Sequence, residues 1–284
     1  MNNARAKRGA LTLCALIALS AVRGTAVPAG QDSAAVELPI LMYHHILKDK
    51  TKLGKYTISP EELEADLDWL LREGYEPVTV QQLIDWTDGA GELPARPVML
   101  TFDDGYESFY EYAFPLLRAK GCKAVYSVIG RYADEYTEQE DHHINYSHCT
   151  WEQIAELQGS GLVEIQNHSY DLHTNEKGRK GSMKVSGEAV SAYQERLQDD
   201  IGRMQELCQS RCGVTPTAFT YPFGGVSEEA LPVLRKMGFR AALTCREQIN
   251  LLTGDKEELF SLGRFNRATG QSAASLLKRE IPVS

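Results

Sequence analysis

The sequence has few cysteines, few tryptophans and no apolar run of the roughly 20 residues that a membrane-spanning helix needs. Only 6 cysteines and 3 tryptophans occur in 284 residues, whereas 43% of the residues are hydrophobic and 24% are charged. So few cysteines exclude a disulfide scaffold. The balance of hydrophobic and charged residues excludes a disordered or collagen-like chain, and the length suits one large globular domain.

Positive charge is also scarce. The chain has 30 lysines and arginines against 39 aspartates and glutamates, for a formal net charge of -9. Four of the cations and none of the acids lie in residues 1–30, so the remainder holds 26 cations and 39 acids, a net charge of -13. Nucleic acids and anionic lipid surfaces would repel such a protein, which favours a neutral or cationic substrate.

Residues 1–26 have the order of a secretory signal peptide. The cations Arg5, Lys7 and Arg8 precede an apolar stretch at 9–22, and small residues follow it. We expect cleavage near Ala26, with an uncleaved anchor as the alternative. Residues 27–37 then form a linker and residues 38–284 the folded domain, and we expect a protein that is secreted or held at the cell envelope.

The five cysteines outside the predicted signal peptide indicate no disulfide framework. Cys208 and Cys212 lie four residues apart in a predicted helix, which gives poor geometry for a bridge. We expect free thiols, with this one pair as an open alternative. The sequence shows no sign of a stable protein partner, so we expect a monomer.

Short apolar segments alternate with helical patterns from Leu38 onward. Each of four helical patterns ends at a glycine, which suits the left-handed residue that terminates a helix: Gly74, Gly121, Gly161 and Gly238. The segments predict strands at 38–44, 76–80, 97–103, 122–129, 162–168, 216–221 and 238–244. This alternation indicates parallel strands joined by right-handed crossovers, and the even spacing favours one α/β barrel.

Two clusters of metal-ligand type follow predicted strands. Asp103 and Asp104 end one strand, where they are either functional carboxylates or the polar residues of a turn or helix cap. His168 and His173 follow another strand and can converge only if the chain turns there. With one carboxylate, they would form a two-nitrogen, one-oxygen site typical of catalytic zinc.

Two further clusters follow strands. The turn Tyr221, Pro222, Phe223, Gly224 can present backbone N–H groups to a ligand, or can be a plain connection to a helix. His44 and His45 end the first strand, and at most one of them faces the barrel interior. Active sites of α/β barrels lie at the carboxyl ends of the strands, so we expect all four clusters on one face.

A rival metal site would use the three histidines of the polar stretch 133–149, which are His142, His143 and His148. That stretch offers no rigid element on which three ligands could be held together. We therefore expect the metal ion at the strand ends rather than in this loop.

These motifs resemble the polysaccharide deacetylases of carbohydrate esterase family 4, the NodB-homology group. The resemblance covers about residues 38–267, and its anchors are the segment 101–106 and the pair His168 and His173. It implies a distorted (β/α)7-type barrel and a metal-dependent hydrolase that removes acetyl groups from N-acetylglucosamine polymers. By position, Asp103 matches the catalytic base of the family, while Asp104, His168 and His173 match its metal ligands.

Three departures resemble the branch that deacetylates exported poly-N-acetylglucosamine. The two histidines are five residues apart rather than four, Thr220 replaces the usual arginine, and no histidine follows His173. In that branch a Tyr-His pair near the start of the domain supplies the general acid. The resemblance therefore implies His44 as the acid, with His45 as the alternative, and Arg264 is a candidate for the missing guanidinium or an ordinary structural arginine.

The implied cofactor is a divalent metal ion, zinc in the first place and cobalt or nickel as alternatives, which lowers the pKa of its water. Asp103 would accept a proton and His44 would protonate the departing nitrogen, while a backbone N–H near Phe223 or Gly224 supports the oxyanion. We expect Tyr221 or Phe223 to contact the sugar. Peptidoglycan remains an alternative substrate, and an O-acetyl esterase or a non-catalytic glycan-binding protein are alternative functions.

Overall fold

The computed structural model describes residues 35–139, 141–176 and 178–280. The predicted signal peptide and most of the predicted linker lie outside these residues. Within them, no helix is long and apolar enough to span a bilayer. Regular structure begins with β1 (Val36–Leu38), which reaches two residues into the predicted linker.

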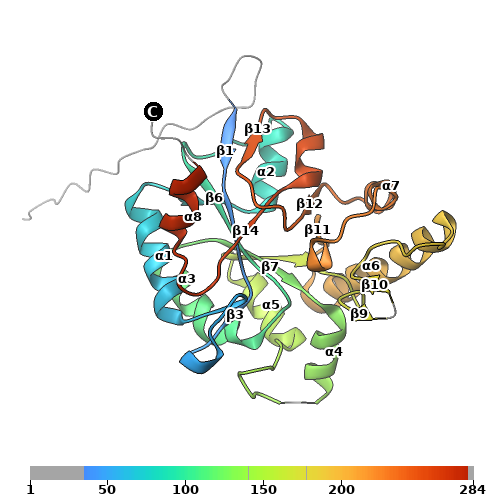
Figure 1. Cartoon of the computed structure of the whole chain (residues 1–284), viewed down its shortest axis with the longest axis horizontal. Helices are drawn as coiled ribbons and strands as arrows, with labels where there is room; N and C mark the ends of the chain where they lie inside the picture. The colour runs from blue at the N-terminus through green and yellow to red at the C-terminus, as the bar shows by residue number, and fades with distance from the viewer. Residues whose placement is uncertain (1–34, 140, 177, 281–284) are drawn as a thin grey trace, which may run out of the picture.

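One curled sheet of parallel strands forms the centre of the molecule (Figure 1). Its strands follow the order β12-β11-β8-β7-β6-β2-β14, and the short β5 pairs with β6 beside this path. The strands are β2 (Ile40–Tyr43), β5 (Glu76–Pro77), β6 (Pro97–Phe102), β7 (Ala124–Val128), β8 (Val163–Asn167), β11 (Ala218–Thr220), β12 (Ala241–Leu243) and β14 (Phe265–Asn266). The predicted α/β class and distorted (β/α)7-type barrel are confirmed.

Helices surround the sheet on its outside (Figure 1). They are α1 (Pro60–Arg72), α2 (Val80–Thr87), α3 (Phe114–Lys120), α4 (Gly130–Glu138), α5 (Trp151–Gly159), α6 (Val190–Cys212), α7 (Ala230–Lys236) and α8 (Ala273–Glu280). Shorter turns of helix lie at Lys50–Lys52, Phe109–Ala113, Pro222–Gly224 and Lys256–Ser261. Ser59, Thr79 and Thr150 each form a capping box at a helix start, and the four predicted terminating glycines are all left-handed.

Alternation along the strands builds two separate apolar layers. Ile40 and Met99 belong to the core inside the curled sheet. Their neighbours Leu41 and Leu100 belong to the core between the sheet and the helices α1, α3 and α5. The same alternation determines which polar side chains face the interior where the strands end.

Several observed strand boundaries differ from the predicted ones, because neighbouring residues pair with different strands or already belong to a helix cap. Pro39 has no N–H, and the predicted strand 38–44 is split there. The part before it, β1, pairs antiparallel with β13 (Asn250–Leu252), whereas β2 pairs parallel with β6. The predicted strand 76–80 ends at Pro77 because Thr79 already caps α2.

The segment 262–266, which was not predicted as a strand, connects the two edges of the sheet. Leu262 donates its N–H to Ala242 O at 3.1 Å and accepts the N–H of Thr244 at 2.8 Å. Four residues later, Asn266 pairs with Met42 of β2. The circle of strands is thereby closed between β12 and β2.

Two long stretches between strands contain regular structure of their own. The stretch 133–149 begins inside α4, so its first third is helical. The stretch 174–187 contains a short antiparallel hairpin of β9 (Asn175–Glu176) and β10 (Arg179–Lys180). The open question of a disulfide is also answered, because Cys208 and Cys212 are both free thiols.

Candidate active site

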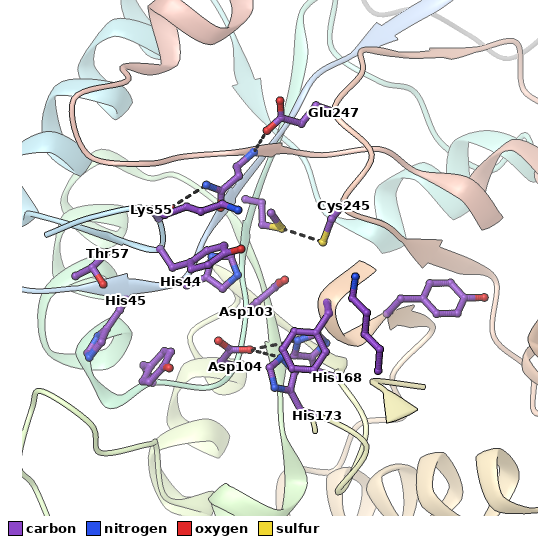
Figure 2. Close-up of a pocket in the computed structure, with 17 residues that line it drawn as sticks. His44, His45, Lys55, Thr57, Asp103, Asp104, His168, His173, Cys245 and Glu247 are labelled. Carbon is purple, nitrogen blue, oxygen red and sulfur yellow. Dashed lines mark hydrogen bonds and ion pairs between the residues drawn. The ribbon is translucent and has the colours of Figure 1, made fainter. Parts of the chain in front are cut away.

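The four polar clusters meet at one end of the curled sheet, around a cavity of about 410 Å³ (Figure 2). His44 continues the inward face of Ile40 and Met42, and Asp103 continues that of Met99 and Thr101. His168, His173, Tyr221 and Phe223 also line the cavity. Residues far apart in the sequence come together because parallel strands end at the same edge.

Asp104, His168 and His173 form a ready set of metal ligands. One ligand atom from each lies within 4.8 Å of the others. The Nε2 atoms of both histidines lie 3.3 Å from Asp104 Oδ1, and that buried oxygen has no hydrogen-bond partner within the described part of the chain. His168 donates Nδ1–H to Thr220 O at 2.8 Å, which directs its Nε2 toward the cavity. A buried acceptor facing two imidazole nitrogens fits a divalent cation.

The electrostatics of two of these ligands, Asp104 and His173, also suit a metal ion. Burial alone would raise the pKa of Asp104, but the neighbouring histidines, His168 foremost, hold that pKa below its ordinary value. Burial lowers the pKa of His173 to about 4. The carboxylate is thus charged and the His173 imidazole neutral near neutral pH, which are the forms that bind metals.

Left-handed backbone conformations shape the strand ends at the site. Among the described residues, the non-glycine residues with positive φ are Asp104 at 74°, Ser169 at 73° and Phe223 at 56°. Each follows the end of a different strand. The turn at Ser169, whose N–H binds Asn167 Oδ1 at 2.8 Å, brings His168 and His173 together although they are five residues apart.

Asp103 forms a buried ion pair with Arg264. The two residues are 2% and 0% exposed, and Arg264 Nη1 lies 2.8 Å from Asp103 Oδ1. Burial would raise the pKa of Asp103, but the Arg264 charge holds it below the ordinary value. Thr220, at the position where most family members have arginine, instead binds Ser127 Oγ at 2.7 Å. Arg264, from the C-terminal part of the chain, thus supplies the guanidinium beside Asp103.

The two histidines after β2 have different surroundings. His45 has both ring nitrogens occupied, because Nδ1 lies 2.6 Å from Ser108 Oγ and Nε2 lies 3.1 Å from Asn145 O. In contrast, His44 Nδ1 is buried without a hydrogen-bond partner in the described residues. Burial lowers the pKa of His44, and the charges of Asp104 and Asp103 partly oppose this shift. Of the two histidines, His44 is therefore the one with an unpartnered ring nitrogen in the described part of the chain.

The turn after β11 narrows the choice of oxyanion donor. The N–H of Gly224 donates to Tyr221 O at 2.9 Å, so it is already used within the turn. Phe223 has no such bond among the described residues, and its ring lies 4.2 Å from that of His173. Tyr221 and Pro222 are buried behind it. Of the two predicted donors, the Phe223 amide is the one left for a ligand.

The three histidines of the alternative metal site do not form a cluster of ligands. His142 binds Glu107 at 2.5 Å, and His143 stacks on Tyr146. His148 is buried and packs against other aromatic rings. Within the described residues, the one group of three or more potential metal ligands is the set of Asp104 and the two histidines.

Part of the cavity wall is formed by residues that no sequence motif marks. Residues from the segment after β3 (His45–Ile46) and from the C-terminal third line the cavity without belonging to a recognisable motif: Lys55, Tyr56, Thr57, Cys245, Glu247 and Asn266. Asn266 connects both groups, because its N–H donates to Glu247 Oε1 at 3.4 Å and its Nδ2 donates to Lys55 O at 2.8 Å. Only the folded chain shows that these segments adjoin.

The geometry agrees with comparisons to known proteins. The family model described as polysaccharide deacetylase matches residues 90–242. The poly-beta-1,6-N-acetyl-D-glucosamine N-deacetylase of Escherichia coli K12 is 27% identical over 261 residues, which cover 86% of this chain but only 38% of that relative.

Two solved structures can be superposed on this chain over nearly their whole length. A de-N-acetylase from Aggregatibacter actinomycetemcomitans is 27% identical with a TM-score of 0.74, covering 85% of this chain and 99% of that one. IcaB from Ammonifex degensii is 28% identical with a TM-score of 0.70, covering 87% and 96%. The family match spans more than half of the sequence, and the chain belongs to the polysaccharide deacetylase family.

Proposed function

We propose that this chain is a metal-dependent deacetylase that removes N-acetyl groups from poly-β-1,6-N-acetylglucosamine. The observation that carries the proposal is a single cavity where a metal-ligand set, a carboxylate paired with a buried arginine and an unpartnered imidazole meet. A glycan-binding protein has no need of this combination. The names of the relatives favour the β-1,6-linked polymer over peptidoglycan.

Asp104, His168 and His173 would hold the metal ion. A divalent ion, when bound there, would acidify a water molecule and polarise the acetyl carbonyl. Zinc is the ion that this donor set suits first, and cobalt and nickel also accept imidazole and carboxylate ligands.

The proton transfers fall to the remaining groups. Asp103, kept ionised by Arg264, accepts the proton of the attacking water. The Phe223 N–H supports the negative charge that develops on the carbonyl oxygen. His44 in its protonated form then donates to the sugar nitrogen as the carbon–nitrogen bond breaks. Water and amide thus become acetate and a free amino sugar.

The proposed place of action is outside the cell. Residues 1–26 have the pattern of a signal peptide, and a polymer that is exported meets its deacetylase only after that step. Mass spectrometry of the protein recovered from the culture medium and from the cell envelope would test both parts. A mature N-terminus near Ala26 is expected, and an intact N-terminus in the cytosol would contradict this localisation.

Acetate release tests the proposed reaction. Purified protein is incubated with β-1,6-linked N-acetylglucosamine oligomers, with and without a chelator, and in parallel as the Asp103→Asn variant. We expect chelator to abolish the release reversibly, with recovery on addition of zinc. We expect Asp103→Asn to reduce kcat by about 100-fold or more, because it removes the proton acceptor and keeps the shape.

The matched control is Asp171→Asn, because Asp171 is a partly exposed carboxylate near His173 that pairs with Arg131 outside the cavity. Its activity should equal that of the wild type. Acetylated xylan as a second substrate distinguishes O-acetyl from N-acetyl hydrolysis. Release from oligomers that survives both chelation and Asp103→Asn would exclude the proposed mechanism.

A further inference from the structure

An exposed aromatic ring stands beside the candidate general acid. Tyr56 lines the same cavity as His44 and is 49% exposed. The centre of its ring lies 4.9 Å from that of His44, with the two planes at 61°. A half-exposed tyrosine at the edge of a polar cavity offers apolar surface to whatever enters it.

The position of Tyr56 is set by the backbone of its loop rather than by its side chain. Tyr56 O accepts the N–H of His45 at 3.0 Å, and Lys55 O accepts Asn266 Nδ2 at 2.8 Å. Gly54 O accepts the N–H of Thr269 at 3.0 Å. Because these bonds involve main-chain atoms of the loop, a change of the Tyr56 side chain should leave the loop in place.

A second exposed ring borders the cavity on the side of the metal ligands. Phe223 is 39% exposed and packs against His173 at 4.2 Å. Figure 2 shows His44 and His173 on different sides of the Asp103 and Asp104 carboxylates. A polymer whose reacting acetyl group lies at these carboxylates can extend along the His44 side of the cavity, where Tyr56 is an exposed ring in the wall.

Resting on the proposed function, we propose that Tyr56 is a substrate-binding residue that receives a pyranose ring of the polymer next to the sugar being deacetylated. The C–H groups of a pyranose ring pack on an aromatic face, as apolar groups do. The ligand class is a neutral hexosamine in an oligomer. Tyr56 would thus contribute to binding of chains rather than to hydrolysis of the acetyl group itself.

Besides His44, the side chain of Lys55 lies against the Tyr56 ring. Its Nζ lies 5.0 Å from the centre of the ring, and the residue is exposed. An exposed lysine can move off the ring as a sugar arrives and leave the aromatic face to the sugar. The assignment to the ring and not to the ammonium is testable with separate variants.

The test compares Tyr56→Ala, Tyr56→Phe, Lys55→Ala and the wild type. Binding of a β-1,6-linked N-acetylglucosamine pentamer is measured by calorimetry, and its deacetylation by acetate release. Hydrolysis of 4-nitrophenyl acetate reports separately on the reacting groups. The control is Tyr146→Ala, because Tyr146 is 48% exposed and also stacks on a histidine, yet does not line the cavity.

We expect Tyr56→Ala to weaken pentamer binding about tenfold and to raise KM by a similar factor. Its kcat and its rate with the small ester should stay near those of the wild type. Tyr56→Phe, Lys55→Ala and Tyr146→Ala should bind the pentamer like the wild type.

Wild-type binding by Tyr56→Ala would overturn this inference and leave the proposed deacetylase unaffected. An equal loss in Lys55→Ala would assign the contact to the ammonium group and overturn the role of the ring. If the wild type released no acetate from the pentamer, the proposed function would fail, and the calorimetric comparison would still decide whether Tyr56 binds the sugar chain.

Discussion

Asp103 and Asp104 are neighbours in the sequence and have different environments. Asp103 continues the inward face of β6 and meets Arg264, whereas Asp104 adopts a left-handed conformation and turns toward the two histidines. Two adjacent carboxylates are buried at the same strand end because each has its own cationic or proton-donating partners. The proposed function assigns the first carboxylate to a proton and the second to a metal ion.

Replacing Arg264 tests whether its charge keeps Asp103 ionised. In Arg264→Met the buried Asp103 loses the charge that lowers its pKa, so its pKa should rise and the ionised form should disappear at a higher pH. We expect the acid limb of the pH profile of kcat/KM to move upward, with a loss of about 100-fold at neutral pH. The measurement is acetate release across pH 5 to 9.

Arg246→Met serves as the control, since Arg246 is exposed and belongs to the same C-terminal third of the chain. Circular dichroism establishes that each variant is folded before its profile is compared. A folded Arg264→Met enzyme with the wild-type profile would show that the guanidinium does not act on Asp103.

The roles of the candidate acid and the candidate metal ligands remain predictions. That these residues line one cavity could be predicted, because motif and strand end coincide there. The choice between His44 and His45 could not, because adjacent residues at a strand end look alike in the sequence. It is the contacts of His45 with Ser108 and Asn145 that separate the two. Tyr56 could not be predicted either, because an exposed tyrosine in a loop belongs to no sequence motif.

Among the elements, α1, β2 and the start of α8 are joined by one buried carboxylate. Asp66 accepts hydrogen bonds from Arg267 Nε at 2.6 Å, Tyr43 Oη at 3.2 Å and the Ala273 N–H at 2.8 Å. Tyr43 directly precedes His44, so this network fixes the strand that carries the candidate acid. Two of these contacts, those with Arg267 and Ala273, connect residues more than 200 positions apart.

Asp66→Ala should therefore cost far more stability than an ordinary charge removal. It leaves the buried Arg267 with the longer ion pair to Glu62 at 3.8 Å in place of the one at 2.6 Å, and we expect a loss of about 3–5 kcal/mol in the free energy of unfolding. Denaturation by urea, followed by circular dichroism, measures it. Asp68→Ala on the same helix is the control, because Asp68 is largely exposed and its ion pair with Lys120 should contribute less than about 1 kcal/mol.

A similar midpoint for the Asp66→Ala and Asp68→Ala variants would show that the buried network does not hold these elements together.

The elements that the sequence revealed best are those with marked ends. The four left-handed glycines that end helices were readable because a single residue determines each. The split at Pro39 and the closing segment 262–266 were not, because they depend on which strand lies alongside. Two-residue strands such as β14 have too little periodicity to be recognised.

At the scale of the whole molecule, charge separates substrate from product. The chain carries a formal net charge of -9. The proposed substrate is neutral, whereas its deacetylated product is cationic, so the acidic protein should attract the product more strongly. Salt screens such attraction between exposed charges.

We therefore expect deacetylated polymer to inhibit the reaction at low ionic strength and to lose most of this inhibition in high salt. The initial rate on fully acetylated pentamer should change little between the two conditions, which is the internal control. The measurement is acetate release with and without added product polymer. Inhibition that is equal at low and high salt would argue against retention by charge.

The convergence of four distant segments was predictable because parallel strands of one barrel end at one face. Asp103 and Arg264 are 161 residues apart, and they meet because Asp103 follows β6 while Arg264 directly precedes β14. The sequence does not show where a loop lies in space. The part of the cavity wall formed by Lys55, Glu247 and Asn266 could therefore not be predicted.

The left-handed residues at the strand ends bear on the heat tolerance of the protein. Asp104, Ser169 and Phe223 adopt a backbone conformation that costs a residue with a side chain roughly 1 kcal/mol and costs glycine little. Glycine at Asp104 or Phe223 would remove a metal ligand or the ring beside His173. Selection for thermostable variants would therefore favour substitutions at the positions that the reaction needs, and the most stable form of this chain would not be its most active one.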